Sequence, residues 1–262
     1  MQLNHYTDCA ALLGIVKADG LCMRATRFSH LNDSREYRWI SDKLTPIKEQ
    51  LAVKLELEYD PDSHVYPYIL CFCDLADEAL MWRLYGKNGH GFMLTLDYEE
   101  IARHAMNPYG TGNNPDCLQG IVYANEKDWE EKFFGAYKIY QGKLSSGKTD
   151  DLDEVAAFMK RDIFEYENET RYMRPVHDII SFSCNDKDSI IEKDGEDVEN
   201  VKFRESSFGV TPYIEIVLPK KALKSITVGF GYNFEQQRDS IKALLDQNGY
   251  ENVEIVKSKI IL

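Results

Sequence analysis

Short strand-like runs alternate with capped helical segments along this chain of 262 residues. A short strand-like run over 2–6 is followed by Thr7 and Asp8, which can cap a helix, and then by Gly20, which can end the unit. Near the other end of the chain, Asn233 can cap a helix that lies between two strand-like runs. An alternation of this kind predicts a mixed α and β architecture.

Hydrophobic periodicity places the expected elements. Runs rich in β-branched and aromatic residues predict strands at 2–6, 21–28, 68–73, 91–96, 120–123, 169–176, 179–184, 213–218, 225–229 and 253–257. Helical spacing predicts helices after Asp8, from residues 32–34 with an interruption at Pro46, at 78–85, 98–106 and 150–164, and from Asn233 to near Gly249. No internal repeat or linker is evident. We therefore predict one α+β domain over 1–262, with a mixed, mostly antiparallel sheet flanked by helices.

Charge limits the partners that the chain can attract. The 44 acidic and 31 basic side chains give a net charge of −13, and an overall negative field repels phosphate backbones and anionic membranes. Nucleic-acid binding would need a local basic groove. Residues 185–200 are strongly charged but lack the ligand spacing of a calcium-binding loop, so we expect a solvated loop there.

The cysteines and the start of the chain bear on its location. Six cysteines could pair, but a chain of this size does not need disulfides to fold. The first residues lack the pattern of a secretory signal, and no apolar run approaches the roughly 20 residues that span a bilayer. We expect a cytoplasmic protein with reduced cysteines that does not bind a membrane.

The common catalytic motifs are absent from the sequence. There is no phosphate-binding loop, zinc-protease helix or nucleophile elbow, and the scattered histidines show no ligand spacing, so we expect no metal site. Gly229 and Gly231 lie between a predicted strand and a predicted helix, where free backbone N–H groups could hold an anion. A glycine-eased turn accounts for the same residues, and we favour that interpretation.

Four segments place polar side chains where a fold does not require them. They are His5-Tyr6-Thr7, the stretch 24–36 that ends in Asn32-Asp33 and Glu36, the stretch 81–86 with Met81-Trp82 and Tyr85, and the stretch 167–171 with Glu167, Glu169 and Arg171. In this order the set resembles a widespread bacterial family known as domain of unknown function 2971. The resemblance spans nearly the whole chain but implies no reaction by itself.

The opening strand with its His-Tyr-Thr, the short helix after it and a late strand with a glutamate are also similar to the layout of ADP-ribosyltransferases. The toxin and defence branch, which modifies nucleic acids or proteins, is the most similar. This likeness implies an ADP-ribosyltransferase-like fold with NAD as substrate. It also implies transfer of ADP-ribose to a nucleic-acid or protein target, or hydrolysis of NAD, by a toxin or anti-phage effector with a potential antitoxin or defence-system partner.

The chemistry of NAD cleavage assigns roles to the candidate residues. Breaking the nicotinamide glycosidic bond passes through an oxocarbenium-like ribose, which a carboxylate beside the sugar stabilises. Glu169 is the first candidate for this role. In an extended strand Glu167 and Arg171 share its face, and the arginine could keep a carboxylate ionised. His5 would hydrogen-bond a ribose hydroxyl, completing the candidate catalytic set.

The likeness also implies a set of NAD-binding residues. Thr7 shares the face of His5 on the first strand, whereas Tyr6 points the other way. Arginine grips phosphate oxygens with two hydrogen bonds, and aromatic rings offer stacking planes for nicotinamide or adenine. The predicted NAD-binding residues are His5, Tyr6, Thr7, Arg24, Arg27, Trp82, Tyr85 and Arg171.

Structural interpretations of the same residues stay open. His5 and Thr7 could serve only to satisfy a strand edge and cap the first helix. Glu36 with Asp33 has the spacing of a capping box, and Arg171 could form only an ion pair with Glu167 or Glu169. Trp82 and Tyr85 lie three residues apart, as on the buried face of a helix.

Two other functions also stay open. One is a non-catalytic nucleotide-sensing or partner-binding module that uses the same pocket. The other is a metal-dependent nuclease that uses Glu167, Glu169 and Asp33, although these acids have no recognised spacing. The NAD interpretation requires His5 and Glu169 to converge on one cleft.

Overall fold

A computed structural model describes residues 1–31, 34–59, 65–106, 116–141, 147–177, 201–206 and 209–261 of the chain. Asn32, Asp33, the strand predicted at 179–184 and the charged loop predicted at 185–200 lie outside the described residues.

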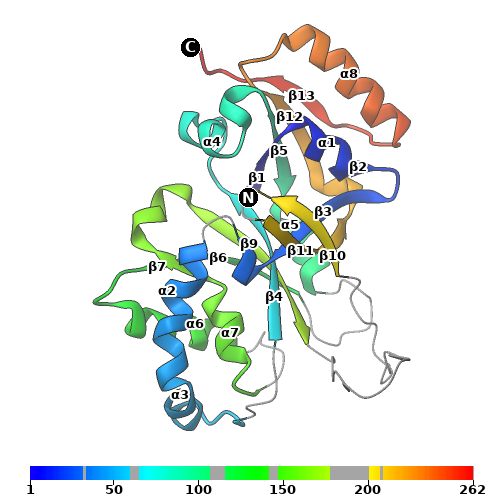
Figure 1. The fold of residues 1–262 in the computed structure, drawn as a ribbon. Helices are drawn as coiled ribbons and strands as arrows, with labels where there is room; N and C mark the ends of the chain where they lie inside the picture. The colour runs from blue at the N-terminus through cyan, green and yellow to red at the C-terminus, as the bar shows by residue number, and fades with distance from the viewer. Residues whose placement is uncertain are drawn as a thin grey trace.

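One large sheet organises the described parts of the chain (Figure 1). Its 11 strands there are β1 (Gln2–Thr7), β2 (Val16–Lys17), β3 (Gly20–Arg27), β4 (Val65–Cys73), β5 (Phe92–Asp97), β6 (Cys117–Gly120), β9 (Glu169–His177), β10 (Lys202–Ser206), β11 (Gly209–Leu218), β12 (Leu223–Val228) and β13 (Glu254–Lys257). The main path follows the order β10-β11-β3-β4-β1-β5-β12-β13, while β9 pairs with both β4 and β6. The β12–β13 pair is parallel and the other pairs are antiparallel, so the sheet is mixed and mostly antiparallel.

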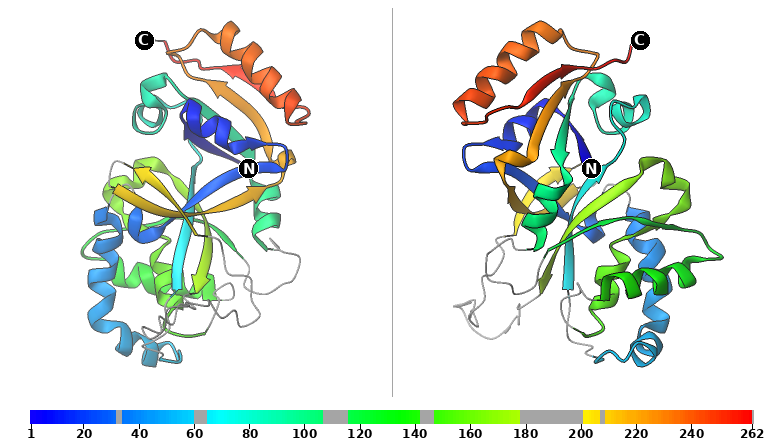
Figure 2. Two further views of the ribbon diagram at one scale, coloured as in Figure 1. Left: turned by 45° about the vertical axis from the view of Figure 1, so that its right-hand side comes forward. Right: turned by 180° about the vertical axis from the view of Figure 1, so that it is seen from behind.

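Helices flank this sheet in two groups (Figures 1 and 2). The helices are α1 (Cys9–Ile15), α2 (Ser34–Leu44), α3 (Lys48–Lys54), α4 (Ala79–Leu84), α5 (Tyr98–Met106), α6 (Trp129–Tyr140), α7 (Asp151–Ala156) and α8 (Phe234–Gln247). Helices α2, α3, α6 and α7 gather beside a small parallel pair, β7 (Val122–Ala124) and β8 (Met159–Arg161), whereas α8 packs on β12 and β13. These elements confirm an α+β fold with flanking helices. The ADP-ribosyltransferase-like architecture and the extent of the domain stay predictions.

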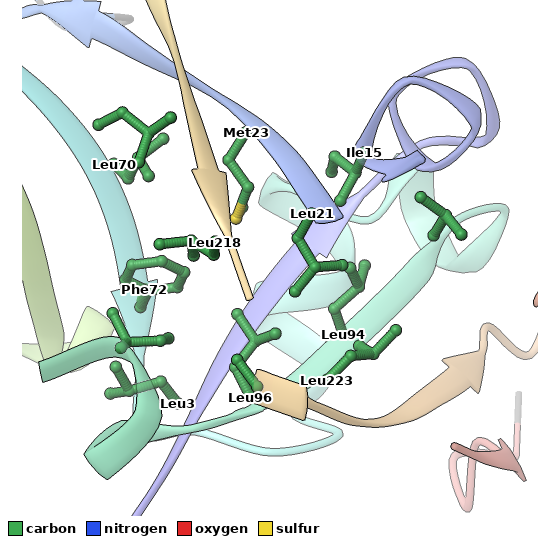
Figure 3. Packing of buried hydrophobic residues seen from close by; sticks show 14 of the residues in the cluster. Leu3, Ile15, Leu21, Met23, Leu70, Phe72, Leu94, Leu96, Leu218 and Leu223 are labelled. Carbon is green, nitrogen blue, oxygen red and sulfur yellow. The ribbon is translucent and has the colours of Figure 1, made fainter. Parts of the chain in front are cut away.

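Strand β4 separates the buried clusters of the molecule. Its residues Leu70 and Phe72 face the largest hydrophobic cluster, where Figure 3 shows them beside leucines from β1, β5 and β11. The alternate residues of the strand face the other side: Ile69 packs with α2, α6 and α7, and Cys73 packs in a small cluster with Trp82. Each fully buried leucine contributes roughly 1.5–3 kcal/mol by leaving water. Cys71 lies on this second side, between the residues of these two smaller clusters.

Local capping signals were sufficient for several helices. The Asp8 carboxylate accepts a hydrogen bond from the Ala11 N–H at 2.8 Å and starts α1, and helix α5 occupies the predicted range. Pro46 interrupts the helix predicted from residues 32–34: a 3₁₀ turn over Thr45–Ile47 separates α2 from α3.

The helix predicted at 150–164 is confirmed only over its first part, and the rest of the prediction is wrong. Helix α7 ends at Ala156, β8 follows, and a 3₁₀ helix over Asp162–Glu167 leads to β9. Phe158 and Met159 are fully buried, as the periodicity required. A short apolar run is buried equally well in a helix or in a strand, and here the parallel pairing with β7 decides in favour of the strand. Helix α6 and strand β10 were not predicted.

The glycines between β12 and α8 form a structural turn. The Gly229 N–H donates to the Gly91 carbonyl at 3.0 Å, and the Gly231 N–H donates to the Gly89 carbonyl at 2.9 Å. A Cβ atom on Gly229 would lie 2.2 Å from the Gly89 carbonyl oxygen, so only glycine allows this approach. Both N–H groups are used by backbone, which supports the turn over an anion site.

No helix within the described ranges is long and apolar enough to cross a membrane. The cysteines that the structure describes are all free thiols, namely Cys9, Cys22, Cys71, Cys73 and Cys117; Cys184 lies outside the described residues.

Candidate functional site

A cavity of about 590 Å³ is lined in part by β4. This volume is within the range of about 300–1,000 Å³ typical of small-molecule sites. All four polar segments of the sequence contribute to its lining, through His5, Tyr6, Thr7, Arg24, Glu36, Met81, Tyr85, Glu167, Glu169 and Arg171. Segments that are far apart in the chain therefore meet at one site.

His5 and Glu169 line this cavity together, as the NAD interpretation requires. The His5 ring extends from β1 to β4, where Nδ1 lies 3.0 Å from the Cys71 carbonyl oxygen. On the other side of β4, Cys71 pairs with Arg171, and Cys73 pairs with Glu169. Strand β4 thus stands between the histidine strand and the glutamate strand and brings both side chains to the same cavity.

The contact with Cys71 determines the state of the His5 ring. A carbonyl oxygen only accepts hydrogen bonds, so Nδ1 carries the proton and Nε2 of the neutral ring is an acceptor. Burial lowers the pKa of His5, and the Cys71 carbonyl opposes this only in part. The ring can therefore accept a hydrogen bond from a ligand hydroxyl at neutral pH.

Five buried charged side chains form the acidic wall of the cavity: Glu36, Lys160, Glu167, Glu169 and Arg171. Arg171 is 0% exposed and the other four are between 4% and 6% exposed. The Lys160 Nζ atom lies 2.9 Å from both Glu167 Oε2 and Glu169 Oε2, and 3.5 Å from Glu36 Oε2. We call these five residues the acidic cluster.

Arg171 connects the acidic cluster to two other elements. Its Nε donates to Glu169 Oε1 at 2.6 Å, and its Nη2 donates to Glu169 Oε2 at 3.1 Å and to Glu36 on α2. Its Nη1 donates to the Ala157 carbonyl at 2.6 Å. The guanidinium therefore joins β9, α2 and the end of α7 in one buried network.

The acidic cluster carries more negative than positive charge. Its three carboxylates and two cations sum to a net charge of −1. Burial raises the pKa of Glu169, but Arg171 and Lys160 outweigh it and hold that pKa well below its ordinary value. Burial lowers the pKa of Lys160, but Glu169 and Glu36 outweigh it and hold that pKa above its ordinary value. Glu169 and Lys160 are therefore both ionised at neutral pH, and the formal charges of the five residues leave negative charge in excess.

Glu167 lines the cavity from a different element than the sequence predicts. We expected residues 167, 169 and 171 to share one face of a strand. Instead Glu167 ends the 3₁₀ helix, Asn168 adopts a left-handed conformation with φ 43°, and the strand begins at Glu169. Glu167 and Glu169 still come together, because both accept hydrogen bonds from Lys160. Glu169 and Arg171 do share one strand face.

Lys160 and Glu36 are the members of the acidic cluster that sequence reasoning missed. Lys160 was assigned to a helix with no role, and nothing local to it signals the contact with Glu167 and Glu169. Glu36 was interpreted as a capping residue, but its carboxylate pairs with Arg171 and Lys160. Its capping partner Asp33 lies outside the described residues. Lysine at 160 becomes informative only once its amino group is known to meet Glu167 and Glu169.

Tyr123 and Cys71 are two further groups beside Glu169. The Tyr123 hydroxyl accepts a hydrogen bond from the Glu169 backbone N–H at 2.8 Å. Cys71 lines the cavity beside Glu169 and Arg171, and burial raises the pKa of its thiol well above the ordinary value. The Cys71 thiol is therefore neutral and is a poor nucleophile at neutral pH.

The predicted aromatic residues divide into two groups. Tyr85 lines the cavity and is 38% exposed, so its ring is accessible to a ligand. Trp82 is 0% exposed, lies outside the lining, and donates from Nε1 to Asp77 Oδ1 at 2.8 Å. A stacking role for Trp82 is therefore wrong, because its ring is enclosed by core residues. This agrees with the alternative interpretation of Trp82 as a buried helix residue.

Tyr6 and Thr7 border the cavity from β1. The Tyr6 hydroxyl donates to the Leu75 carbonyl and accepts from the Glu78 N–H, both at 3.1 Å, and its ring packs edge-on against Trp82. These contacts make Tyr6 chiefly a packing residue. Thr7 does not cap α1, since the cap is Asp8.

The two predicted phosphate-binding arginines also differ. Arg24 is exposed and lines the cavity. Arg27 does not line it: its guanidinium stacks over the Tyr66 ring, 3.5 Å from the ring centroid. Residues alternate between the faces of β3, and the odd step from 24 to 27 turns Arg27 away. The assignment of Arg27 to the ligand is therefore wrong.

No group of three or more His, Cys, Asp or Glu side chains in the described ranges is arranged to hold a metal ion. Between Glu167 and Glu169, the position that a divalent cation would need is taken by the Lys160 amino group. Asp33, the third acid of the nuclease hypothesis, lies outside the described residues.

Comparison with known proteins supports part of the family likeness. Residues 81–172 match the model of a family described as a protein of unknown function, DUF2971. The match begins at Met81 and ends just after Arg171, so it includes two of the four polar segments. No curated protein and no solved structure matches the chain. The similarity to ADP-ribosyltransferases stays a proposal.

Proposed function

We propose that this protein is an NAD-consuming enzyme of the ADP-ribosyltransferase type. It would break the glycosidic bond between nicotinamide and ribose and pass ADP-ribose to a nucleic acid, a protein or water. The observation that carries the proposal is the convergence of four separated polar segments on one cavity, with His5 on one strand and an ionised Glu169 on another.

The charge of the acidic cluster suits this chemistry. As the glycosidic bond breaks, positive charge grows on the ribose, and a nearby excess of negative charge lowers the energy of that state. The acidic cluster has a net charge of −1 and is fixed by ion pairs before any ligand binds. Little reorganisation would be needed during the reaction.

Five residues that line the cavity have separate roles in this scheme. His5 Nε2 would accept a hydrogen bond from a ribose hydroxyl, and Tyr85 would stack on the nicotinamide ring. Glu169 would stand beside the ribose, with Glu167 as the second carboxylate. Arg171 would act through Glu169, because its hydrogen bonds hold that carboxylate in place.

Incubation of the purified protein with labelled NAD tests the proposal. We expect the wild type to release nicotinamide and, in cell extract, to label a macromolecule. Glu169→Gln should reduce the rate by about 100-fold or more, the usual loss when a group that stabilises the transition state is removed. The variant should fold, because two carboxylates and two cations remain in the acidic cluster.

Glu100→Gln is the matched control, since Glu100 lies on α5 outside the cavity and pairs with Arg103 and Lys221. This variant should retain full activity. If the wild type neither releases nicotinamide nor labels any target, the proposal fails.

One observation favours a second function. All three carboxylates of the acidic cluster are already engaged by Lys160 or Arg171, as expected of a rigid binding pocket. A non-catalytic nucleotide sensor would bind NAD or ADP-ribose saturably without turnover. Its binding would be lost in His5→Ala but insensitive to Glu169→Gln, which separates it from the enzyme.

A further inference from the structure

Two arginines at the β3 side of the cavity have no acidic partner. Arg24 on β3 and Arg204 on β10 both line the cavity, and neither forms an ion pair with a carboxylate of the described residues. Arg204 Nη2 donates to Thr26 Oγ1 at 3.1 Å. The Nε atom of Arg204 is buried and has no hydrogen-bond partner among the described residues. The Arg24 guanidinium lies over the Tyr213 ring, 5.0 Å from its centroid.

Strand register brings the two guanidinium groups together. Strand β11 lies between β3 and β10, and Tyr213 on β11 is directly opposite Thr26 on β3. Arg24 approaches this pair from one side and contacts Tyr213, whereas Arg204 approaches from the other side and contacts Thr26. Both arginines therefore reach one place on the sheet.

The carboxylate opposite Arg24 in register does not neutralise the two arginines. Glu215 is opposite Arg24 in register, but its carboxylate pairs with Lys202 Nζ at 2.6 Å. Among the described residues, this face therefore keeps two arginines without a carboxylate partner, in a chain whose net charge is −13. Burial and the nearby Arg24 charge both lower the pKa of Arg204, the mark of an unfavourable environment for a cation. A bound anion would relieve it.

We infer that Arg24, Arg204 and the Thr26 hydroxyl form a subsite for the phosphoryl groups of a nucleotide ligand. Guanidinium groups match phosphate oxygens with paired hydrogen bonds, and the unpartnered Nε of Arg204 is a free donor for one of them. The assignment deepens the proposed function and rests on it for the identity of the ligand, in which these groups are the diphosphate of NAD.

The position of the subsite suits a ligand that also reaches the acidic cluster. Thr26 is opposite Ile69 on β4, and Cys71, which contacts His5, is two residues further along that strand. Two strand residues span about 7 Å. A diphosphate at Thr26 would therefore leave its attached ribose near His5, on the way to Glu169.

Isothermal titration with three probes tests the inference. The probes are ADP-ribose, inorganic pyrophosphate, and nicotinamide riboside, which has no phosphate. Arg24→Gln should weaken the binding of ADP-ribose and pyrophosphate by about tenfold or more, the effect of losing a charge-assisted hydrogen bond. Nicotinamide riboside should bind unchanged. Added salt should weaken pyrophosphate binding less in the variant than in the wild type.

Two further variants complete the test. Arg204→Lys keeps the charge but loses the paired donors, so it should weaken pyrophosphate binding as well. Arg238→Gln removes a cation on α8, outside the cavity, and should bind all probes as the wild type does. Pyrophosphate binding within twofold of the wild type in Arg24→Gln, or an equal loss for nicotinamide riboside, would overturn the inference. Because Arg24 is exposed, its substitution should not unfold the protein.

The outcome is separable from that of the proposed function. If pyrophosphate binding depends on Arg24 but NAD is never cleaved, the subsite stands and the enzyme proposal fails. If NAD is cleaved and Arg24→Gln leaves its KM unchanged, the subsite fails and the enzyme proposal stands.

Discussion

Replacement of Arg171 by methionine tests how the acidic cluster is held together. Methionine fills much of the same space but removes the buried charge and its hydrogen bonds to Glu169, Glu36 and the Ala157 carbonyl. Three carboxylates would then face the single Lys160 cation, so the net charge of the acidic cluster would change from −1 to −2. The variant leaves buried acids uncompensated while the surrounding apolar contacts are kept.

The expected cost is large on the scale of protein stability. Removing one partner of a buried ion pair typically costs about 3–5 kcal/mol, because the remaining charge has neither water nor a counter-ion. A domain is usually stable by about 5–15 kcal/mol, so the variant should fold but should unfold at a much lower urea concentration.

The shift in the folded pKa of Glu169 should have opposite signs in the wild type and in Arg171→Met, so the stability of the two proteins should depend differently on pH. In the wild type, Arg171 and Lys160 hold the folded pKa of Glu169 below its ordinary value of 4.5. The resulting stabilisation is fully present above pH 4.5 and is lost as the pH falls through the folded pKa. In Arg171→Met, burial should raise that pKa above 4.5. Lowering the pH from 8 to 5.5 should then stabilise the variant and leave this contribution unchanged in the wild type.

Urea titration followed by tryptophan fluorescence measures both effects, since buried Trp82 reports on unfolding. Arg103→Met is the control: Arg103 is exposed on α5 and pairs with Glu100, so its loss should change stability little. A variant that is as stable as the wild type at pH 8, or one that becomes less stable as the pH falls to 5.5, would refute the account of the acidic cluster as a compensated buried network.

Two further predictions concern the fold. Gly86→Ala should cost about 1–3 kcal/mol, because its Cβ would lie 2.4 Å from Cε3 of the fully buried Trp82 ring; Gly120→Ala, which meets no atom within 4 Å, should be close to neutral in the same urea titration. Asn233→Ala should cost about 1 kcal/mol, since the Asn233 side chain caps α8 by accepting the Gln236 N–H at 3.1 Å. An unchanged midpoint for Gly86→Ala or Asn233→Ala would contradict the corresponding contact.

Elements whose signals are local were predictable from the sequence. The strand-helix unit at the start of the chain, helix α5 and the capped helix α8 agree with their predicted positions, because caps, turns and periodicity act over a few residues. The region 150–167 was not predictable in this way. There the same apolar residues suit a helix or a strand, and pairing of β8 with β7 made the choice.

The candidate site was predictable in its residue types and only partly in its geometry. His5, Glu169 and Arg171 stood out as polar residues on predicted strands, and the structure brings them to one cavity. Lys160 carried no signal, because its contacts with Glu36, Glu167 and Glu169 depend on the tertiary structure. Trp82 carried a misleading signal, since an aromatic residue in a polar segment suits a binding site and a core equally.

The amino-acid sequence by itself determined the elements that have local caps, turns or periodicity, and the segments that carry unexpected polar side chains. These properties depend on hydrogen bonds and side-chain spacing within a few residues of one another. Only the tertiary structure decided which polar segments meet. The contact between Glu36 and Arg171 joins residues 135 positions apart. Contacts of this kind follow from strand order, register and burial, which are properties of the whole folded chain and not of any one segment.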